Sequence, residues 1–461
     1  MQKILLLIAS LFYFNFILAE NEIKSWQGIH ETPLSCLEQQ FAEPPVEFAN
    51  HVIWGWEGKM DKKTICNDLD SIKKKGFRAV IFEAGYKLPF KYLSEEWFKA
   101  IRTGVLEAKK RGMKVWIIDE GKYPSGFAGG KFSQERPDLR MQALVIGDTI
   151  QIKRGEVMTN HKIAPEIISA VAVSTSGAPN RTVAINNGEI SFNAGLDDWK
   201  VLLVKSDFRT AVTRAVNNPN GGKDATNSLC DYLNPIAVQQ FIDWTHEQYK
   251  KYLGKELGTT VLGFRGDEPD YAHLPWTPSI VQTFKETKGY DPTPYLASFF
   301  TASPTIQEQR VKADYWDVWS SLFATHFFKL QADWCAANGV AHITHLNKEH
   351  EMPACVKAEG DYFRNLSKVQ IPGVDAIWNQ IWPGTLNDFP KLASSVAHVY
   401  GKPRAFSESF AAYHISPTIP QAKFVVDHQI ARGINFFEFM FWLAGSKPVS
   451  YTHLTLPTTE R

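Results

Sequence analysis

The chain repeats one unit along most of its length: an amphipathic helix, a glycine, a short apolar strand, and a polar stretch with carboxylates and aromatic residues. Glycine adopts the left-handed conformation that closes a helix more readily than other residues. With strand-like segments at 52–54 and 374–378 included, the strands number eight, which is the count that closes a parallel (β/α)8 barrel. We therefore predict an α/β fold of the (β/α)8 TIM barrel type. The closing glycines are Gly76, Gly112, Gly258, Gly339, Gly401 and Gly433.

The predicted barrel is interrupted once. Between 139 and 229 the hydrophobic periodicity changes from helical to alternating, which predicts a small β-rich insertion after strand 3. The barrel then occupies 50–138, with strands 1–3, and 230–445, with strands 4–8. Its second part opens with Asn234-Pro235, a pair typical of a helix N-terminus. Strands are expected at 51–54, 78–82, 114–118, 259–264, 341–346, 374–378, 404–408 and 435–441, and helices near 62–75, 95–111, 235–253, 309–338, 353–368, 385–400 and 419–432.

Three segments flank the barrel. Lys3 and the apolar run that follows it predict a signal peptide at 1–19, since the run is short for a membrane span. We therefore expect an exported protein, periplasmic or extracellular, with no membrane span. Residues 20–49, rich in Pro and Glu, are expected to be a linker. The Thr- and Pro-rich tail at 446–461 is interpreted as non-native or truncated sequence.

The composition narrows the possible partners. The formal net charge is only +1, so there is no basic field to hold nucleic acid or an anionic membrane. The five cysteines show no CxxC spacing, and we expect neither a zinc site nor a nucleophile among them. Aromatic residues make up 13% of the chain, which supplies many rings to bury or to present to a ligand.

Carboxylates follow several of the predicted strands. Glu268 comes directly after strand 4, Glu408 ends strand 7, and Glu349 follows strand 5. Chemistry in a TIM barrel takes place where the strands end, and the hydrolysis of a glycosidic bond needs two carboxyl groups, one protonated and one ionised. We therefore take Glu268, Glu408 and Glu349 as candidate catalytic residues.

Aromatic and polar residues in the same loops are the candidate substrate-binding residues. A flat ring packs well against the CH face of a sugar, and its polar tip can stay in a wet cleft. Charged side chains in these loops would bind hydroxyl groups. The candidates are Trp54, Trp56, Tyr86, Asp119, Asp267, Arg364, Trp378 and Tyr413.

A metal site is a further candidate. His345, His350 and the glutamates around them lack the HExxH spacing of a zinc helix, so zinc is not favoured. Strand-end carboxylates could supply oxygen ligands for calcium, and Glu351 and Glu438 are the candidate ligands. The predicted chemistry itself requires no cofactor.

Several short motifs resemble glycoside hydrolase family 106 and its relatives, barrel enzymes typified by bacterial α-L-rhamnosidases. The resemblance covers about 50–445. It implies an inverting hydrolase of exported polysaccharide-degrading systems, often with calcium in the site, and it places Glu268 on the motif that holds the strand-four carboxylate. The partner carboxylate stays open between Glu349, Glu351 and Glu408. The matching segments are 54–59, 119–126 (DEGKYPSG), 262–271 (LGFRGDEPDY), 276–278, 288–290, 360–364, 371–375 (IPGVD) and 407–410.

The sequence thus predicts an exported glycoside hydrolase that acts on a polysaccharide or oligosaccharide, α-L-rhamnosides among the candidates, with Glu268 as general acid. The alternative is a non-catalytic carbohydrate-binding barrel, in which the aromatic residues still bind sugar. A metal-dependent hydrolase of the amidohydrolase kind fits less well, because its first strand carries a His-x-His pair and here only His51 is present.

Overall fold

The computed structural model describes residues 33–45, 48–210, 213–214, 223–224, 226–271, 273–385, 387–413 and 417–445. The predicted signal peptide at 1–19 and the predicted tail at 446–461 lie outside this part of the chain. Among the described helices, none combines the length and the apolar character needed to cross a membrane.

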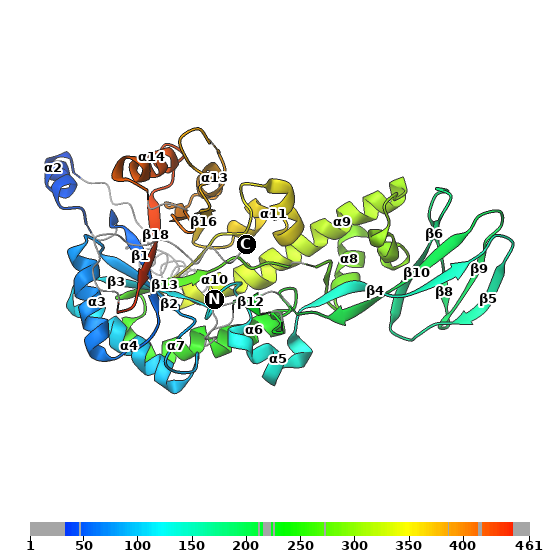
Figure 1. The fold of residues 1–461 in the computed structure, drawn as a ribbon, viewed down its shortest axis with the longest axis horizontal. Coiled ribbons are helices and arrows are strands. Elements are labelled where there is room, and N and C mark those ends of the chain that lie inside the picture. Colours follow the sequence, from blue (N-terminus) through cyan, green and yellow to red (C-terminus); the bar gives the residue numbers. More distant parts are fainter. Residues whose placement is uncertain are drawn as a thin grey trace, which may run out of the picture.

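Eight parallel strands close into a barrel, as predicted (Figure 1). Their order around the barrel is β1-β18-β17-β16-β15-β13-β3-β2. Strands that are successive barrel strands in the chain therefore lie side by side, as short right-handed crossovers require. The barrel strands are β1 (His51–Trp56), β2 (Ala79–Ala84), β3 (Lys114–Ile118), β13 (Val261–Gly266), β15 (Ala341–Thr344), β16 (Ile371–Ala376), β17 (Phe406–Ser409) and β18 (Phe436–Leu443).

Helices surround this barrel, and several begin where the sequence predicts. Ser94 caps α4 by accepting a hydrogen bond from the amide of Trp97, and Asn234 caps α6 in the same way. The helices are α2 (Leu34–Ala42), α3 (Lys62–Lys74), α4 (Glu95–Lys110), α5 (Lys131–Glu135), α6 (Pro235–Trp244), α7 (His246–Leu253), α8 (Ile280–Lys288), α9 (Ile306–Phe323), α10 (Lys329–Ala337), α11 (Met352–Glu359), α12 (Tyr362–Leu366), α13 (Pro390–Val399) and α14 (Ile419–Ile430), with a π-helical turn η6 (Ala324–Phe328) between α9 and α10.

The helices differ from the prediction at several places. The helix expected over 235–253 is divided at Thr245, whose ψ of −84° breaks it into α6 and α7. The helix expected near 353–368 is divided at Gly360, which has a φ of 76°. Helix α8 was not predicted, and α2 lies inside the segment expected to be a linker, with none of its residues buried.

Side chains of the barrel strands alternate between two environments. Ile53, Ile81 and Ile343 pack with one another inside the barrel, whereas Trp54 and Trp56 pack against the surrounding helices. Period-two alternation produces this division. The interior is tight at Gly373 in β16, where an added Cβ would lie 2.1 Å from the ring of Phe406.

The β-rich insertion projects away from the barrel (Figure 1). One sheet has the strand order β14-β4-β10-β6-β7 and another the order β5-β9-β8. The strands are β4 (Gln142–Ile152), β5 (Val157–Lys162), β6 (Ile167–Ser174), β7 (Arg181–Thr182), β8 (Ile185–Asn186), β9 (Glu189–Asn193), β10 (Trp199–Phe208), β11 (Thr213–Arg214), β12 (Lys223–Asp224) and β14 (Pro275–Trp276).

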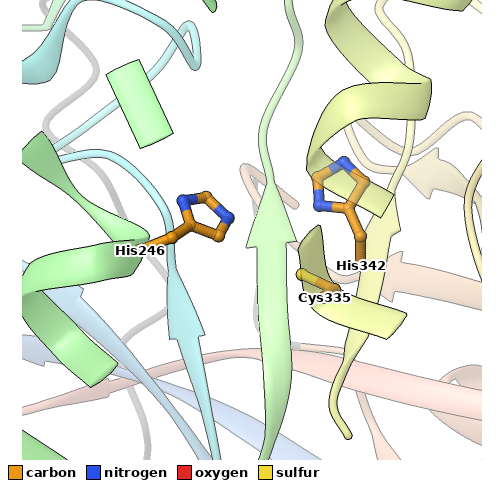
Figure 2. A group of neighbouring side chains, drawn as sticks. All are labelled: His246, Cys335 and His342. Atoms are coloured by element: carbon orange, nitrogen blue, oxygen red, sulfur yellow. The ribbon is translucent and has the colours of Figure 1, made fainter. Parts of the chain in front are cut away.

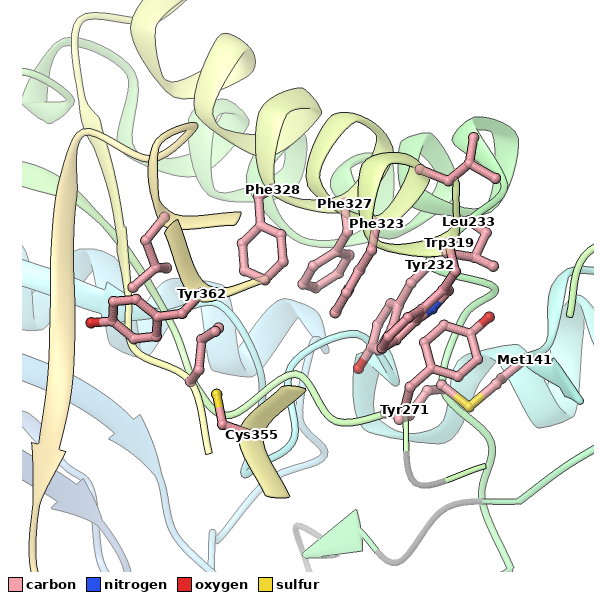
Figure 3. Packing of buried hydrophobic residues seen from close by; sticks show 14 of the residues in the cluster. Met141, Tyr232, Leu233, Tyr271, Trp319, Phe323, Phe327, Phe328, Cys355 and Tyr362 are labelled. Carbon is pink, nitrogen blue, oxygen red and sulfur yellow. The ribbon is translucent and has the colours of Figure 1, made fainter. Parts of the chain in front are cut away.

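The insertion is joined to the barrel by a large aromatic core (Figure 3). Phe323 and Phe327, from α9 and the π-helical turn, pack on Tyr232 with ring centroids 5.2 and 4.3 Å away. The hydroxyl group of Tyr232 in turn donates to the carbonyl of Ser125 in the loop after β3. This core therefore fixes one wall of the region at the ends of the strands.

Candidate active site

A cavity of about 480 Å³ lies at the C-terminal ends of the barrel strands, a volume within the usual range of small-molecule sites. The predicted residues Asp267, Glu268, Glu349, Trp378 and Glu408 all line it. The other lining residues lie in the barrel interior, at the ends of the barrel strands or in the loops after them, and they are Ile53, Glu83, Ile118, Tyr123, Pro124, Asp270, Asn347, Lys348, His350, Asp375, Ile377, Gln380, Ala411, Ala412 and Met440.

Beneath the cavity, the guanidinium of Arg265 contacts three carboxylates. Its Nη1 lies 2.8 Å from Oδ1 of Asp267 and its Nε donates to Oε2 of Glu438 at 3.0 Å. Its Nη2 forms an ion pair with Glu408. Burial lowers the pKa of Arg265, but the three carboxylates outweigh burial and raise it well above its usual value. Arg265 is therefore a fixed positive charge that holds carboxylates from β13, β17 and β18 together.

His345 is a second cation in this cluster. Its Nδ1 lies 2.8 Å from the Leu346 carbonyl, which can only accept, so Nδ1 carries a proton. Its Nε2 lies 3.3 Å from Asp267 and 3.4 Å from Glu408, and also 2.9 Å from Nη2 of Arg265. Burial lowers the pKa of His345, but the two carboxylates raise it well above its usual value. A protonated His345 brings the charge of the cluster closer to neutral. The attraction between His345 and the two carboxylates therefore outweighs the repulsion from Arg265.

Glu268 and Asp267 are neighbours with opposite pKa shifts. Burial, and then the charge of Asp267, raises the pKa of Glu268 to about 8. Burial alone would also raise the pKa of Asp267, but the Arg265 charge and a hydrogen bond from His345 hold it below its usual range. At neutral pH one carboxyl is therefore protonated and the other ionised. Glu268 also has a φ of 41°, a strained conformation of the kind found at functional sites.

Two more carboxyl groups on the cavity wall favour the protonated form. Burial raises the pKa of Glu349 to about 7, and Oε1 of Glu349 accepts a hydrogen bond from the Leu346 amide at 3.0 Å. Burial and the charge of Glu408 raise the pKa of Asp375 well above its usual value. Several acidic groups in one cavity share too little positive charge for all of them to ionise.

The loop after β3 holds the backbone of Asp267 in place through hydrogen bonds. Asp119 is fully buried, and its Oδ1 accepts from the Ser125 hydroxyl at 2.6 Å. The amide of Asp267 donates to the same hydroxyl oxygen at 2.7 Å. Glu120 accepts from the amides of Gly121, at 2.7 Å, and Gly129, at 2.9 Å, and so shapes the loop. Asp119, predicted to bind a hydroxyl group of the substrate, is instead a residue that positions the cavity wall.

Trp54 and Trp56, which were predicted to bind substrate, are not among the residues that line the cavity. Both side chains are fully buried between the barrel and its helices, and Nε1 of Trp54 donates to Asp68 of α3 at 3.2 Å. Strand β1 extends to Trp56, two residues further than predicted, and alternation turns both rings away from the barrel interior.

Four other predicted residues lie away from the cavity lining. Arg364 donates to the carbonyl and Oδ1 of Asp317 at 2.8 and 2.7 Å, which ties α12 to α9. Tyr413 is buried and donates to the Ile381 carbonyl at 3.2 Å. The half-buried ring of Tyr86 lies 4.8 Å from Nζ of Lys122. Glu351, predicted to bind metal, points into solvent with 65% of its side chain exposed.

Glu438, the other predicted calcium ligand, faces Arg265 in the barrel interior and is fully buried. Arg265 already supplies the positive charge that a calcium ion would bring to Glu438. Burial raises the pKa of Glu438 to about 7, although Arg265 opposes the shift. Metal binding by Glu438 therefore stays a prediction, while the structure gives this carboxylate an ion-pair partner within the protein.

Arg265, His345 and Asp375 belong to the site, but the sequence did not single them out as site residues. The sixth strand was predicted at 374–378, which put Asp375 inside it, whereas the strand is Ile371–Ala376 and Asp375 lies near its end. His345 directly follows β15. A strand-end rule with correct boundaries would have found both. Arg265 lies inside β13, and a charged side chain is tolerated in a buried strand only when it is paired with opposite charges. Those partners are not evident from the sequence.

Trp378 is the predicted aromatic platform that the structure leaves available, with 54% of its surface exposed at the cavity. We expect Trp378→Ala to raise KM about tenfold with little change in kcat, because the ring would bind ground state and transition state alike. Steady-state kinetics of the purified variant measure this. Trp382→Ala is the matched control, since Trp382 packs on Tyr413 with centroids 5.8 Å apart; an equal rise in KM there would contradict the platform role.

Comparisons with known proteins agree with this architecture. A family model described as alpha-L-rhamnosidase, for glycoside hydrolase family 106, matches residues 157–450. The chain is 24% identical over 459 residues to a protein of Formosa agariphila named "Putative beta-glucuronidase", covering 87% of this chain. It also resembles the structure of a rhamnosidase from Novosphingobium sp. PP1Y, with a TM-score of 0.66, 15% identity and 90% of this chain covered.

Both relatives are longer than this chain. The match covers 37% of the Formosa protein and 56% of the Novosphingobium rhamnosidase. At 15% identity the structural similarity shows a shared fold, and a shared fold does not determine the chemistry, which depends on the residues of the cavity.

Proposed function

Since this chain belongs to glycoside hydrolase family 106, we propose that its barrel hydrolyses glycosidic bonds of a polysaccharide or oligosaccharide. The observation that carries the proposal is that Glu268 and Glu408 line one cavity in different electrostatic environments. Glu268 lies next to the negative charge of Asp267, whereas Glu408 contacts Arg265 and His345. Two carboxyl groups with different protonation states are what this reaction uses.

In the proposed mechanism, Glu268 is the general acid. Its raised pKa keeps a proton on the carboxyl group at neutral pH, and that proton passes to the glycosidic oxygen as the bond to the anomeric carbon breaks. The strained backbone of Glu268 fixes the direction of the carboxyl group. Asp267 stays ionised on Arg265 and maintains the field that holds the proton on Glu268.

Glu408 is the proposed ionised carboxylate, which takes a proton from water as that water attacks the anomeric carbon. The two cations next to Glu408 stabilise its negative charge. Glu349 is the weaker candidate, because burial raises its pKa to about 7 and one of its oxygens is used by the Leu346 amide. Comparing Glu408→Gln with Glu349→Gln separates the two; a larger loss of kcat in Glu349→Gln would reverse the assignment.

We propose α-L-rhamnosides as the first substrates to test, on the strength of the family match. The experiment is turnover of aryl glycosides by the purified chain, with α-L-rhamnosides beside β-glucuronides and other common sugars. Hydrolysis of any member that Glu268→Gln abolishes supports the proposal. Binding of glycans with no hydrolysis of the panel would favour the non-catalytic barrel.

Calcium remains a proposed ligand. The cavity wall offers carboxylate oxygens of Glu349 and Asp375, which suit a hard cation, and a bound cation would hold sugar hydroxyl groups and offset the negative charge of the wall. Calorimetric titration is expected to show one calcium ion per chain, with affinity reduced at least about tenfold in Asp375→Asn. Equal affinity in Asp375→Asn would contradict this assignment, and Glu351→Gln, at an exposed position, is the matched control.

We further propose that the protein is exported. The support is the sequence at 1–19, a lysine followed by an apolar run. Fractionation of cells that express the full chain tests this, and retention of the intact chain in the cytoplasm would contradict it.

A further inference from the structure

A second group of potential metal ligands is formed by His246, Cys335 and His342 (Figure 2), none of which lines the cavity. His246 is the first residue of α7, Cys335 lies on α10, and His342 lies on β15. One ligand atom from each falls within 4.8 Å of the others. All three side chains are fully buried or nearly so, at 0–1% exposure. Three elements far apart in sequence therefore direct ligand atoms to one point.

The hydrogen bonds around His246 fix its tautomer. The Thr245 hydroxyl donates its single proton to the Phe241 carbonyl at 2.7 Å. The same hydroxyl oxygen lies 2.9 Å from Nδ1 of His246, so it must accept there and Nδ1 must carry the ring proton. Nε2 of His246 then has a free lone pair, and it is buried without a hydrogen-bond partner among the described residues.

His342 has both ring nitrogens buried and without a hydrogen-bond partner in the described structure. Both rings are buried, and burial disfavours the charged imidazolium. Both rings are therefore neutral, the form that binds metal ions. Leaving such polar atoms unpaired in an apolar interior is unfavourable, and this calls for a ligand.

The surroundings favour a particular class of ion. The walls are apolar and aromatic, with Phe264 and Trp334 at 4.2 and 5.1 Å from the His246 ring. Two neutral imidazoles and one thiolate carry a charge of −1, so a monovalent ion leaves the buried site neutral. A divalent ion would leave a net positive charge in the interior, which is costly. Thiolate and imidazole together suit copper(I).

We propose that His246, Cys335 and His342 form a three-coordinate site for a soft monovalent metal ion of the copper(I) type. The site ties α7 and α10 to barrel strand β15 and is structural. On binding, the S–H bond of Cys335 breaks, its proton passes to solvent, and a sulfur–metal bond forms. Each imidazole donates a lone pair and keeps its one N–H. Three ligand atoms around one ion lie about 3.5 Å apart. The ligand atoms here lie within 4.8 Å of one another, so metal binding would shorten these distances by about an ångström.

The test uses the full chain with Cys36 and Cys66, the two cysteines that are not fully buried, replaced by serine. Copper(I), buffered by bicinchoninate without oxygen, is expected to bind at one ion per chain and to raise Tm by about 5 °C. X-ray absorption of the loaded protein is expected to show one sulfur and two imidazole nitrogens. This readout needs no change to the ligands themselves.

Substitution of one ligand separates the site from general copper binding. Cys335→Ala is expected to weaken copper binding at least about a hundredfold, and His342→Gln at least tenfold. Cys355→Ala is the matched control, because Cys355 is also buried and lies outside the group. Copper bound through sulfur alone, or bound as tightly by Cys335→Ala as by the parent, would overturn the proposal. Neither result bears on the glycosidase assignment, which rests on the cavity.

Discussion

Replacing Glu268 with glutamine is expected to lower kcat at least about a hundredfold, with KM changed much less. Glutamine keeps the size and polarity of the side chain but has no acidic proton to give to the leaving oxygen, and general acid catalysis contributes about a hundredfold to ten-thousandfold. Because Glu268 lines the cavity and is only half-buried, the substitution should leave the fold intact. Turnover of an aryl glycoside that the parent hydrolyses measures the effect.

The same substitution is expected to change the pH dependence of activity. The active form of Glu268 is protonated, so activity should persist through neutral pH and fall as pH rises through the raised pKa of about 8. An ordinary glutamate would have lost its proton several pH units lower. Glu268→Gln should abolish this alkaline decline. Glu351→Gln is the control for the chemistry of the substitution, since Glu351 points into solvent, and its kcat is expected within about threefold of the parent. A kcat equally close to the parent in Glu268→Gln would count against the assignment at Glu268.

Replacing Arg265 with methionine is expected to lower the free energy of unfolding by about 3–5 kcal/mol and to reduce activity strongly in whatever fraction folds. Arg265 is fully buried and contacts Asp267, Glu408 and Glu438. Its loss leaves buried carboxylates without their counter-ion, a change larger than the loss of a surface pair. Urea denaturation followed by circular dichroism measures the stability.

The control for this prediction is Arg364→Met, which removes an arginine–aspartate pair outside the cavity. Arg364 and Asp317 are partly exposed, at 34% and 44% of their side chains, so a loss of about 1 kcal/mol or less is expected. Equal destabilisation by the two substitutions would show that the buried cluster contributes no more than a surface pair. Raising the pH should not rescue Arg265→Met, because the carboxyl groups it leaves behind are more fully ionised at higher pH.

The barrel was predictable because its signals are local. Six of the barrel strands follow a helix that ends near a glycine, and Gly76, Gly112 and Gly339 do have positive φ values at helix ends. These six units and the two further strands make eight, which leaves few alternatives to closure. Helix α8 was not predicted because the repeating unit is interrupted before it. The segment between β13 and α8 contains β14, which pairs with β4 of the β-rich insertion.

The site was predictable only in part, because side-chain direction depends on the exact strand boundary. Glu268, Glu349 and Glu408 line the cavity as their strand-end positions implied. Strand β1 extends two residues beyond the predicted end, so Trp56 lies in the strand and not in the loop after it, and alternation turns Trp54 and Trp56 to the outer face. Arg265 and His345 were missed because their importance comes from partners on other strands: 80 residues separate Arg265 from His345, and 173 separate Arg265 from Glu438.

The most direct test of the central claim compares two leaving groups in the parent and in Glu268→Gln. A glycoside with a poor leaving group needs a proton from the enzyme, whereas a dinitrophenyl glycoside of the same sugar leaves without one. If Glu268 is the general acid, the variant should lose at least about a hundredfold in kcat/KM on the poor leaving group and less than about tenfold on the activated one. Equal losses on both substrates would contradict the account.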